Sequence, residues 1–367
     1  MTDSTQSIGI RDVARAANVS TATVSRALNR PDSVSEKLRD RITTAIRDLG
    51  YIPDASARAL SSRRTRTIGA IVPTVDNAMF ARGLQALQSY LASQNYLLLL
   101  ATNEYDLEIE LEQARNLVSR GIDGLILRGD ARHPDLRRML LSHAIPFVNV
   151  GVYEPEKPYP SVGVDNEAAG VRITRHLMEL GHRRVATVSA IHSNNDRAQA
   201  RTRGALTVLA EHGATPPAHW QMQVNYHLDE ARQAARTLFS AGDHPTAVIC
   251  GNDVIAYGVM LEAIRMGLKV PEDVSFVGFD DLDWSRHLNP SLTTIHMPTD
   301  EIWVCAGQWL TANLAGEPTI PHRELDFSLV VRESTAPPPA SSQTSHPAPT
   351  AASAATSSPG AGPTGAR

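Results

Sequence analysis

The chain has 367 residues, which is more than one ordinary hydrophobic core accommodates, so two or three domains are expected. Hydrophobic residues make up 42% and charged residues 20%, a composition typical of globular proteins, and no apolar run reaches the roughly 18 residues of a membrane helix. The polar N-terminus has no signal-peptide pattern, and two cysteines, Cys250 and Cys305, are too few for a disulfide framework. These features predict a cytoplasmic protein.

The charge is distributed unevenly along the chain. Residues 1–66 carry 12 Lys and Arg against 7 Asp and Glu, whereas the remainder carries 23 against 32. A basic head on an acidic body is typical of a nucleic-acid-binding module joined to a second function, although charge alone is equally compatible with chance clustering.

The head is predicted to contain three short helices. Residues 10–17 have apolar side chains at helical spacing, and residues 21–28 follow a three-residue interruption with Ser20 placed as the N-cap. A third helix follows Ser35 and ends at Gly50. A helix, a tight turn and a second helix form the helix-turn-helix layout, in which the second helix enters the major groove of DNA.

The second helix carries side chains suited to DNA. Those placed to meet base edges are Thr21, Ala22, Ser25 and Arg26. The guanidinium of Arg26 can donate twice to a guanine, and small side chains leave room for a thymine methyl. Hydroxyl and amide groups suited to phosphate oxygens are provided by Ser20, Thr23, Ser25 and Asn29. The alternative is a three-helix packing module with a solvated Arg26.

Residues 67–333 alternate between apolar runs of strand length and helical stretches. The predicted strands are 68–72, 97–101, 124–127, 147–150, 162–164, 185–188, 222–224, 247–250 and 274–278. Repeated strand–helix units favour parallel sheets covered on both faces, and the length of this region favours two similar lobes. Ligand-binding groups are expected in the cleft, at the carboxyl ends of the strands.

The sequence thus divides into four parts. They are a predicted DNA-binding head (1–50), a short helix with a basic linker (51–66), a two-lobed body with a ligand cleft (67–333) and a tail (334–367). The tail consists mainly of Pro, Ala, Ser, Thr and Gly, so it is expected to be disordered.

Residues 10–29, IRDVARAANVSTATVSRALN, closely resemble the N-terminal signature of the LacI/GalR family of repressors. The resemblance implies an all-α helix-turn-helix head, an α/β two-lobed sensing body of the periplasmic-binding-protein type I, and a homodimer on a pseudo-palindromic operator. Residues 50–53 and 57–60 look like the family's hinge helix. By this resemblance Leu60 would wedge into the central base step, with Ala57 on the same helix face. Leu60 could instead be a linker residue that packs on the body.

The body resembles the same family in two motifs, Asn252-Asp253 and the GFDD segment at 278–281. Position by position, the resemblance implies that the effector is bound by Asn252, Asp280 and Arg201 and covered by the aromatic rings of Phe80 and Tyr226. Such a polar set can bind vicinal hydroxyls, as sugars present, or a carboxylate. The alternatives are structural roles, namely a helix cap for Asp280, a surface ion pair for Arg201 and core packing for Phe80.

Two positions depart from the family pattern. The segment Asn77-Ala78-Met79-Phe80 stands where many relatives have Asn-Pro-Phe-Phe, and Gly151 stands where many have an aspartate. One acidic contact to the effector is therefore expected to be missing, and the identity of the effector stays open.

The sequence predicts a repressor whose operator affinity is controlled by a small molecule, with sugars or sugar derivatives as the expected class. The alternatives are a ligand-binding protein without a DNA function, an activator at some promoters, and an enzyme. No phosphate-binding loop, metal-ligand spacing or nucleophile motif occurs, so neither a cofactor, a metal nor catalysis is expected. The tail has no leucine heptad, which favours a dimer over a tetramer.

Overall fold

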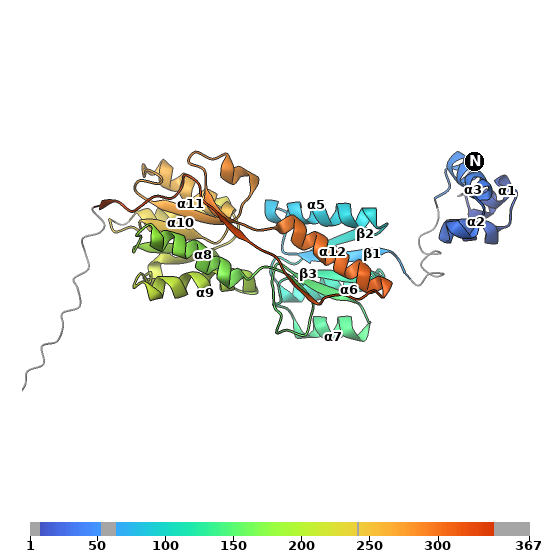
Figure 1. Cartoon of the computed structure of the whole chain (residues 1–367), viewed down its shortest axis with the longest axis horizontal. Helices are drawn as coiled ribbons and strands as arrows, with labels where there is room; N and C mark the ends of the chain where they lie inside the picture. The colour runs from blue at the N-terminus through green and yellow to red at the C-terminus, as the bar shows by residue number, and fades with distance from the viewer. Residues whose placement is uncertain (1–7, 53–63, 241, 341–367) are drawn as a thin grey trace, which may run out of the picture.

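The computed structural model describes residues 8–52, 64–240 and 242–340. At the N-terminal end lies a helical head with the helices α1 (Ile10–Ala16), α2 (Thr21–Asn29) and α3 (Glu36–Leu49), which confirms the three predicted helices (Figure 1). Buried apolar side chains from all three helices form a core of the head's own, among them Val13, Val24 and Ile42. The side chain of Ser20 accepts a hydrogen bond from the Thr23 amide at 3.2 Å and so caps α2, as expected.

The body consists of two lobes, each built on a six-stranded sheet, as the sequence pattern predicted. In lobe 1 the strand order is β11-β5-β4-β3-β1-β2. Its strands are β1 (Thr67–Val72), β2 (Leu97–Thr102), β3 (Gly124–Arg128), β4 (Phe147–Val150), β5 (Ser161–Gly163) and β11 (His322–Glu324). Its helices are α5 (Ala78–Ser93), α6 (Leu107–Ser119), α7 (Pro134–Ser142) and α12 (Thr299–Ala315). The central strands β1, β3 and β4 are almost wholly buried, so the apolar runs were readable in the sequence.

Lobe 2 has the strand order β12-β10-β9-β8-β6-β7. Its strands are β6 (Val185–Ala190), β7 (Gln221–Val224), β8 (Ala247–Cys250), β9 (Ser275–Asp280), β10 (Thr293–His296) and β12 (Ser328–Val330). Its helices are α8 (Asn166–Glu179), α9 (Asp196–Glu211), α10 (Leu228–Phe239) and α11 (Asp253–Arg265). All pairings in the two sheets are parallel except the antiparallel pairing of β10 with β12.

The chain crosses between the lobes three times. It passes from β5 to α8, returns from β10 to α12, and crosses again from β11 to β12. In Figure 1 the orange α12 accordingly lies beside the cyan α5 of lobe 1 rather than among its sequence neighbours. The contact is close, because a Cβ on Gly83 of α5 would lie 2.1 Å from the indole of Trp303 in α12.

The body extends beyond the boundary at residue 333 that composition suggested. Ser334 is fully buried, and its hydroxyl donates to the Phe276 carbonyl at 2.6 Å. The carbonyl of Ala336 lies 2.9 Å from Nε2 of His182. The segment 334–336 therefore packs on lobe 2 because its backbone and hydroxyl groups complete hydrogen bonds of that lobe. The rest of the expected tail, 341–367, lies outside the described residues, as do the hinge residues Ala57 and Leu60.

Among the described parts of the chain, no helix combines the length and the apolar character needed to cross a membrane.

Candidate DNA-binding helix and effector-binding cleft

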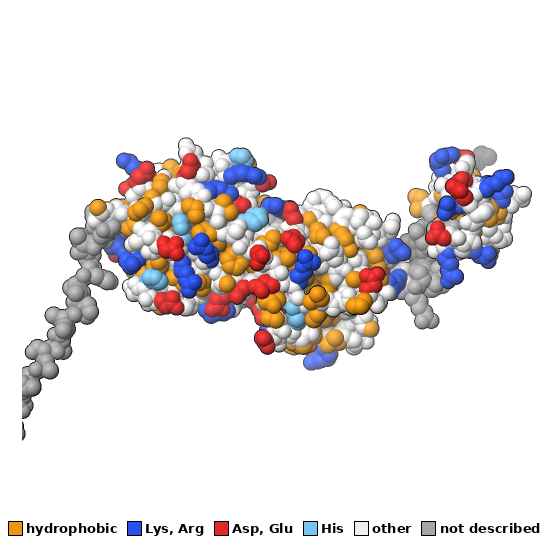
Figure 2. All heavy atoms as spheres, in the orientation of Figure 1, with side chains coloured by type: hydrophobic (Ala, Val, Ile, Leu, Met, Phe, Trp, Pro, Cys, Tyr) orange, Lys and Arg blue, Asp and Glu red, His pale blue; other side chains and the backbone are white. Residues whose placement is uncertain are grey.

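The outer face of α2 presents the predicted DNA-contacting side chains. Thr21, Ala22, Arg26 and Asn29 are exposed, while Val24 and Ala27 turn toward the core of the head. The guanidinium of Arg26 makes no ion pair with any residue that the structure describes, so its donors are free for another partner. Figure 2 shows further Lys and Arg side chains on the visible face of the head.

Four polar side chains at the start and end of α2 pair with one another. The hydroxyls of Ser20 and Thr23 lie 2.9 Å apart, and the amide of Asn29 donates to the Ser25 hydroxyl at 3.2 Å. These contacts hold the side chains along the exposed face of the helix. The structural role of Ser20 as a cap is compatible with its expected contact to phosphate, because a hydroxyl can both donate and accept.

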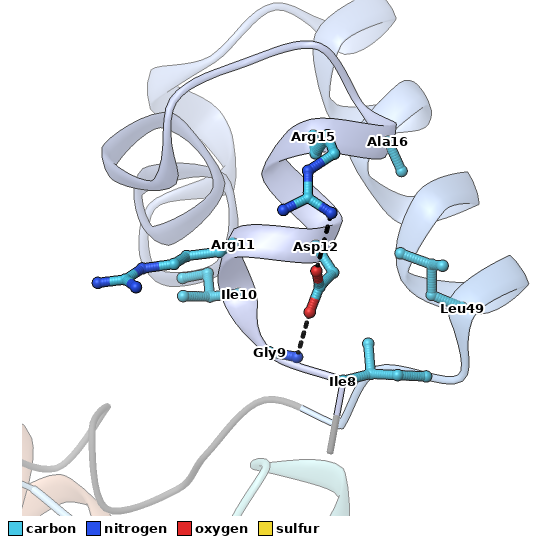
Figure 3. Close-up of a pocket in the computed structure, with 8 residues that line it drawn as sticks. All are labelled: Ile8, Gly9, Ile10, Arg11, Asp12, Arg15, Ala16 and Leu49. Atoms are coloured by element: carbon cyan, nitrogen blue, oxygen red, sulfur yellow. Dashed lines mark hydrogen bonds and ion pairs between the residues drawn. The ribbon is translucent and has the colours of Figure 1, made fainter. Parts of the chain in front are cut away.

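A shallow hollow lies at the start of α1, between that helix and Leu49 of α3 (Figure 3). A helix cap lies in this hollow, in which the Gly9 amide donates to the half-buried Asp12 carboxylate at 3.0 Å. Arg15 also reaches this carboxylate, at 3.3 Å. Since Asp12 is satisfied within the head, we assign no ligand to this hollow.

The carboxyl ends of the strands of the two lobes face one another across a cleft. The amide of Asn194 in lobe 2 donates to the Tyr105 carbonyl of lobe 1 at 2.9 Å. The carboxylate of Asp196, at the start of α9, accepts hydrogen bonds from the backbone amides of Asp130 and Ala131, which follow β3. These bonds hold the loops of the two lobes together at the cleft.

Two of the residues predicted to bind the effector, Arg201 and Asp280, lie together in lobe 2. The Arg201 guanidinium is 3.7 Å from the Asp280 carboxylate, and both side chains are buried. Burial raises the pKa of Asp280, and the neighbouring Arg201 and Arg128 oppose the shift. Neither carboxylate oxygen of Asp280 makes a well-formed hydrogen bond among the described residues, and the Asn252 side chain lies near enough to help lower the pKa of Asp280.

Arg201 is held in place by two neighbours within lobe 2. Its Nε donates to the Asn166 side chain at 3.0 Å, and its Nη1 donates to the Gly251 carbonyl at 3.2 Å. Helix α9 lies unusually close to α8, since a Cβ on Gly204 would lie 2.2 Å from the Glu167 carbonyl. The glycine three residues after Arg201 thus permits the close packing that brings Arg201 to Asn166.

Asn252 combines a structural and a free polar group. Its Oδ1 accepts a hydrogen bond from the Ile255 amide at 2.9 Å and thereby caps α11. Its Nδ2 is buried and has no hydrogen-bond partner among the described residues. The next residue, Asp253, accepts bonds from Ser285, Thr294 and the Leu282 amide, so it serves the interior of lobe 2.

The two predicted aromatic residues take different places. Phe80, in the first turn of α5, is only 1% exposed, and its ring lies under the guanidinium of Arg128 with 5.6 Å between Cζ and the ring centre. Tyr226 follows β7 and faces Tyr105 of lobe 1 with ring centres 6.2 Å apart. These two tyrosines line two hollows of about 310 Å³ and 430 Å³ at the edge of the cleft.

Three cleft residues were not found from the sequence: Arg128, Tyr105 and Arg197. Arg128 ends β3, Tyr105 follows β2, and Arg197 lies in the first turn of α9. The Arg197 guanidinium is buried and pairs with Asp196 at 2.7 Å. Burial raises the pKa of Tyr105, so this phenol stays protonated. Only their positions directly after predicted strands could have identified Arg128 and Tyr105.

Asp281 and Trp284 lie near the cleft but serve elsewhere. The Asp281 carboxylate contacts Nδ1 of His296 at 3.0 Å and pairs with Arg332, so it ties the end of β9 to two segments that cross between the lobes. The Trp284 side chain is 70% exposed. Within the described ranges no three His, Cys, Asp or Glu side chains gather in a metal-binding arrangement.

Comparison with known proteins agrees with this geometry. Residues 9–54 match the lacI family of bacterial regulatory proteins, and residues 174–335 match a periplasmic binding protein-like domain. The transcriptional repressor PurR of Vibrio vulnificus is 35% identical over 291 residues, which cover 79% of this chain and 86% of that protein.

Two solved structures are similar over nearly their whole length. A lac repressor dimer bound to operator and the anti-inducer ONPF superimposes with a TM-score of 0.81, at 25% identity, over 90% of this chain and all of that one. A complex of the transcriptional regulator CelR with cellobiose gives a TM-score of 0.66, at 28% identity, over 89% of this chain and 99% of that one.

The exposed α2, the two-lobed body and the extent of these matches lead to one conclusion. The chain belongs to the LacI family and is a DNA-binding transcriptional repressor rather than an enzyme.

Proposed function

We propose that two copies of the chain bind a pseudo-palindromic operator and that a small molecule in the cleft controls this binding. The observation that carries the proposal is a pair of neighbouring polar groups in lobe 2, the buried Nδ2 of Asn252 and the Asp280 carboxylate, which make no well-formed hydrogen bond among the described residues. Buried polar groups without partners are costly, and a ligand that satisfies them gains binding energy in return.

The proposed binding site draws on both lobes. Arg201, Asn252, Asp280 and Tyr226 come from lobe 2, and Phe80 comes from lobe 1. A ligand held between them has different contacts when the lobes move, which is the requirement for coupling to a distant site. Neutral hydroxyls suit Asp280 and Asn252, so sugars and sugar derivatives are the proposed class.

For the DNA site we propose that Arg26, Thr21, Ala22 and Ser25 read bases. Ser20, Thr23, Ser25 and Asn29 are proposed to position the head on phosphates. The hinge residues Ala57 and Leu60 are proposed to enter the minor groove at the centre of the operator. A DNA-binding protein of this kind acts where the chromosome lies, so we propose a cytoplasmic location.

The test begins with selection of binding sites from a random duplex library by the full chain. We expect two inverted half-sites, because each head of a dimer contacts one of them. Arg26→Ala should recover sites with a relaxed base at one position per half-site. Recovery of single, non-repeated sites by a monomeric protein would contradict the dimer.

The selected operator then serves to test the cleft. Fluorescence anisotropy of labelled operator, measured with and without sugars and sugar derivatives, shows whether a compound tightens or loosens binding. Arg201→Ala and Asn252→Ala should abolish the response while DNA binding without ligand remains. A response retained in both variants would place the effector outside the cleft. A second possibility, activation at some promoters, is tested by a reporter fused downstream of the selected site.

A further inference from the structure

Arg128 is the cationic side chain of the cleft that lacks a carboxylate partner. Its guanidinium makes no ion pair within 4 Å with any described residue, whereas Arg197 pairs with Asp196 and Arg201 lies next to Asp280. Within the part of the chain that the structure describes, its hydrogen-bonding contacts are confined to a long one with the sulfur of Met79, at 3.9 Å, and its buried Nε has no partner. The Phe80 ring lies beside it, with 5.6 Å between Cζ and the ring centre. An unpaired guanidinium in such a place is costly unless something compensates for its charge.

The space around this guanidinium is created by Gly151. Arg128 ends β3 and pairs in register with Val150, so Gly151 follows at the end of the neighbouring strand β4. A Cβ on Gly151 would lie 2.0 Å from Nη1 and 2.5 Å from Cζ of Arg128. The guanidinium therefore occupies the place that any side chain at position 151 would fill, including an acidic one.

Among the buried or partly buried side chains at the cleft, arginines outnumber carboxylates by one, whereas the exposed carboxylates Asp76, Glu104 and Asp106 line the hollows at its edge. Three arginines face it, Arg128, Arg197 and Arg201, against the two carboxylates of Asp196 and Asp280. Asp130 also lies near, but it is engaged with Arg137 and Lys157. Burial, and next the positive charge of Arg197, lower the pKa of Arg128 to about 9, which agrees with a cation that has too few anionic neighbours.

We propose that the effector carries a carboxylate or phosphate group and that Arg128 binds its anionic oxygens beside Gly151. The hydroxyls of the same molecule then face Asp280 and Asn252, so the effector is a hydroxylated acid such as a sugar acid or a sugar phosphate. The planar guanidinium has two parallel donors that match either group. This inference rests on the proposed function of the cleft and narrows its ligand class.

The test compares neutral and anionic forms of the same sugars. Glucose, galactose, mannose and ribose are each measured beside their aldonic acids, uronic acids and terminal phosphates, at constant ionic strength, by thermal shift of the full chain. A ligand that binds only the folded chain raises its stability, and at concentrations well above the Kd this increase grows with the logarithm of the ligand concentration. We expect stabilisation by acidic members only. Stabilisation by neutral members, or by no acidic member, would overturn the inference.

Variants then connect the charge to Arg128. For an acidic compound that binds, Arg128→Met should raise the Kd about 10- to 100-fold, the range of a hydrogen bond to a charged group. Arg128→Lys should restore part of the affinity, because a point charge remains. Arg115→Met is the matched control, since Arg115 is exposed on α6 and outside the cleft, and it should leave the Kd unchanged. An unchanged Kd in Arg128→Met would overturn the role of Arg128.

The pH dependence separates the two anions. A phosphate ester loses its second charge near pH 6, so its binding should weaken between pH 7 and pH 5, whereas a carboxylate with a pKa near 4 should keep its affinity there. The outcome also separates this inference from the proposed function. If neutral ligands bind and their affinity falls in Arg201→Ala, the effector is not an anion but does bind in the cleft. If the Kd of a ligand is unchanged in both the Arg128 and the Arg201 variants, the ligand does not bind in the cleft.

Discussion

The guanidinium of Arg201 and the carboxylate of Asp280 lie 3.7 Å apart, with 7% and 1% of the two side chains exposed. The two residues come from different elements, α9 and the end of β9, and Asp280 has a backbone φ of 103°, a region that non-glycine residues rarely adopt. Strained backbone of this kind is commonly found at functional sites. The pair therefore combines a buried charge, open hydrogen-bonding capacity and a costly backbone conformation at one point.

Removal of one partner from this pair should destabilise lobe 2. Arg201→Met leaves Asp280 buried without its nearest cation, and we expect a loss of about 3–5 kcal/mol in the free energy of unfolding by urea. The double variant Arg201→Met/Asp280→Asn should lose less than the two single variants added together. Arg203→Met on the same helix is the control, because its pair with Glu167 is exposed and should contribute less than about 1 kcal/mol. Additive effects at Arg201 and Asp280 would refute the coupling.

Arg26→Ala should reduce specificity rather than general affinity for DNA. The free guanidinium of Arg26 on the exposed face of α2 is suited to a guanine, and one such contact contributes about 1–3 kcal/mol of discrimination. Anisotropy titrations with the selected operator and with unrelated DNA measure both quantities. Equal weakening on both DNAs would instead indicate a phosphate contact.

Leu60→Ala tests the hinge, which lies outside the described residues. An apolar wedge that opens a base step acts only at the specific site, so the variant should weaken operator binding far more than non-specific binding. The bend angle of the operator, followed by energy transfer between dyes at its ends, should fall in parallel. If the variant bends the operator as the parent does, Leu60 is a linker residue.

His182 makes the stability of lobe 2 depend on pH. Burial lowers its pKa from 6.5 to about 4, and its two ring nitrogens contact the Thr246 hydroxyl and the Ala336 carbonyl. The unfolded chain binds a proton near pH 6.5 while the folded chain resists it, so stability is complete above pH 6.5 and is lost as the pH falls toward 4. The full difference amounts to about 3 kcal/mol.

Urea unfolding at pH 7 and pH 5 measures this dependence. His182→Gln should lose part of the stability at pH 7 and should show a smaller decrease between the two pH values. His143→Gln, at an exposed position on the C-terminal end of α7, should retain the decrease of the parent chain. An unchanged decrease in His182→Gln would assign the effect to other groups.

The sequence was informative where burial left a pattern, and less so elsewhere. Strands such as Phe147–Val150 were predicted because every residue is buried on both faces of a parallel sheet. The strands β11 and β12 were missed because segments such as His322–Glu324 are short and largely exposed, and they pair only because a neighbouring strand lies beside them. Strand β10 (Thr293–His296) is buried, but its sequence TTIH contains no apolar run that could be recognised. Their pairing depends on tertiary structure rather than on local preference.

The same distinction applies to the cleft. Asn252 and Asp280 were singled out through motifs, whereas Arg128 has no motif around it, and its significance depends on the place that Gly151 leaves for its guanidinium. The sequence did show the absence of an acidic residue at position 151. It could not show that a cation from the adjacent strand takes up the vacated space, because that requires the register of β3 with β4.

The late strands β11 and β12 have a consequence for synthesis on the ribosome. The head has its own core and is complete at residue 49, so it can fold while the rest of the chain is still being translated. Lobe 1 lacks its edge strand until residue 324 has emerged, and lobe 2 lacks its own until residue 330. A premature stop codon between the end of α3 and β11 therefore leaves both halves of the sensor unfinished, while the released fragment still carries the complete head with its DNA-reading helix.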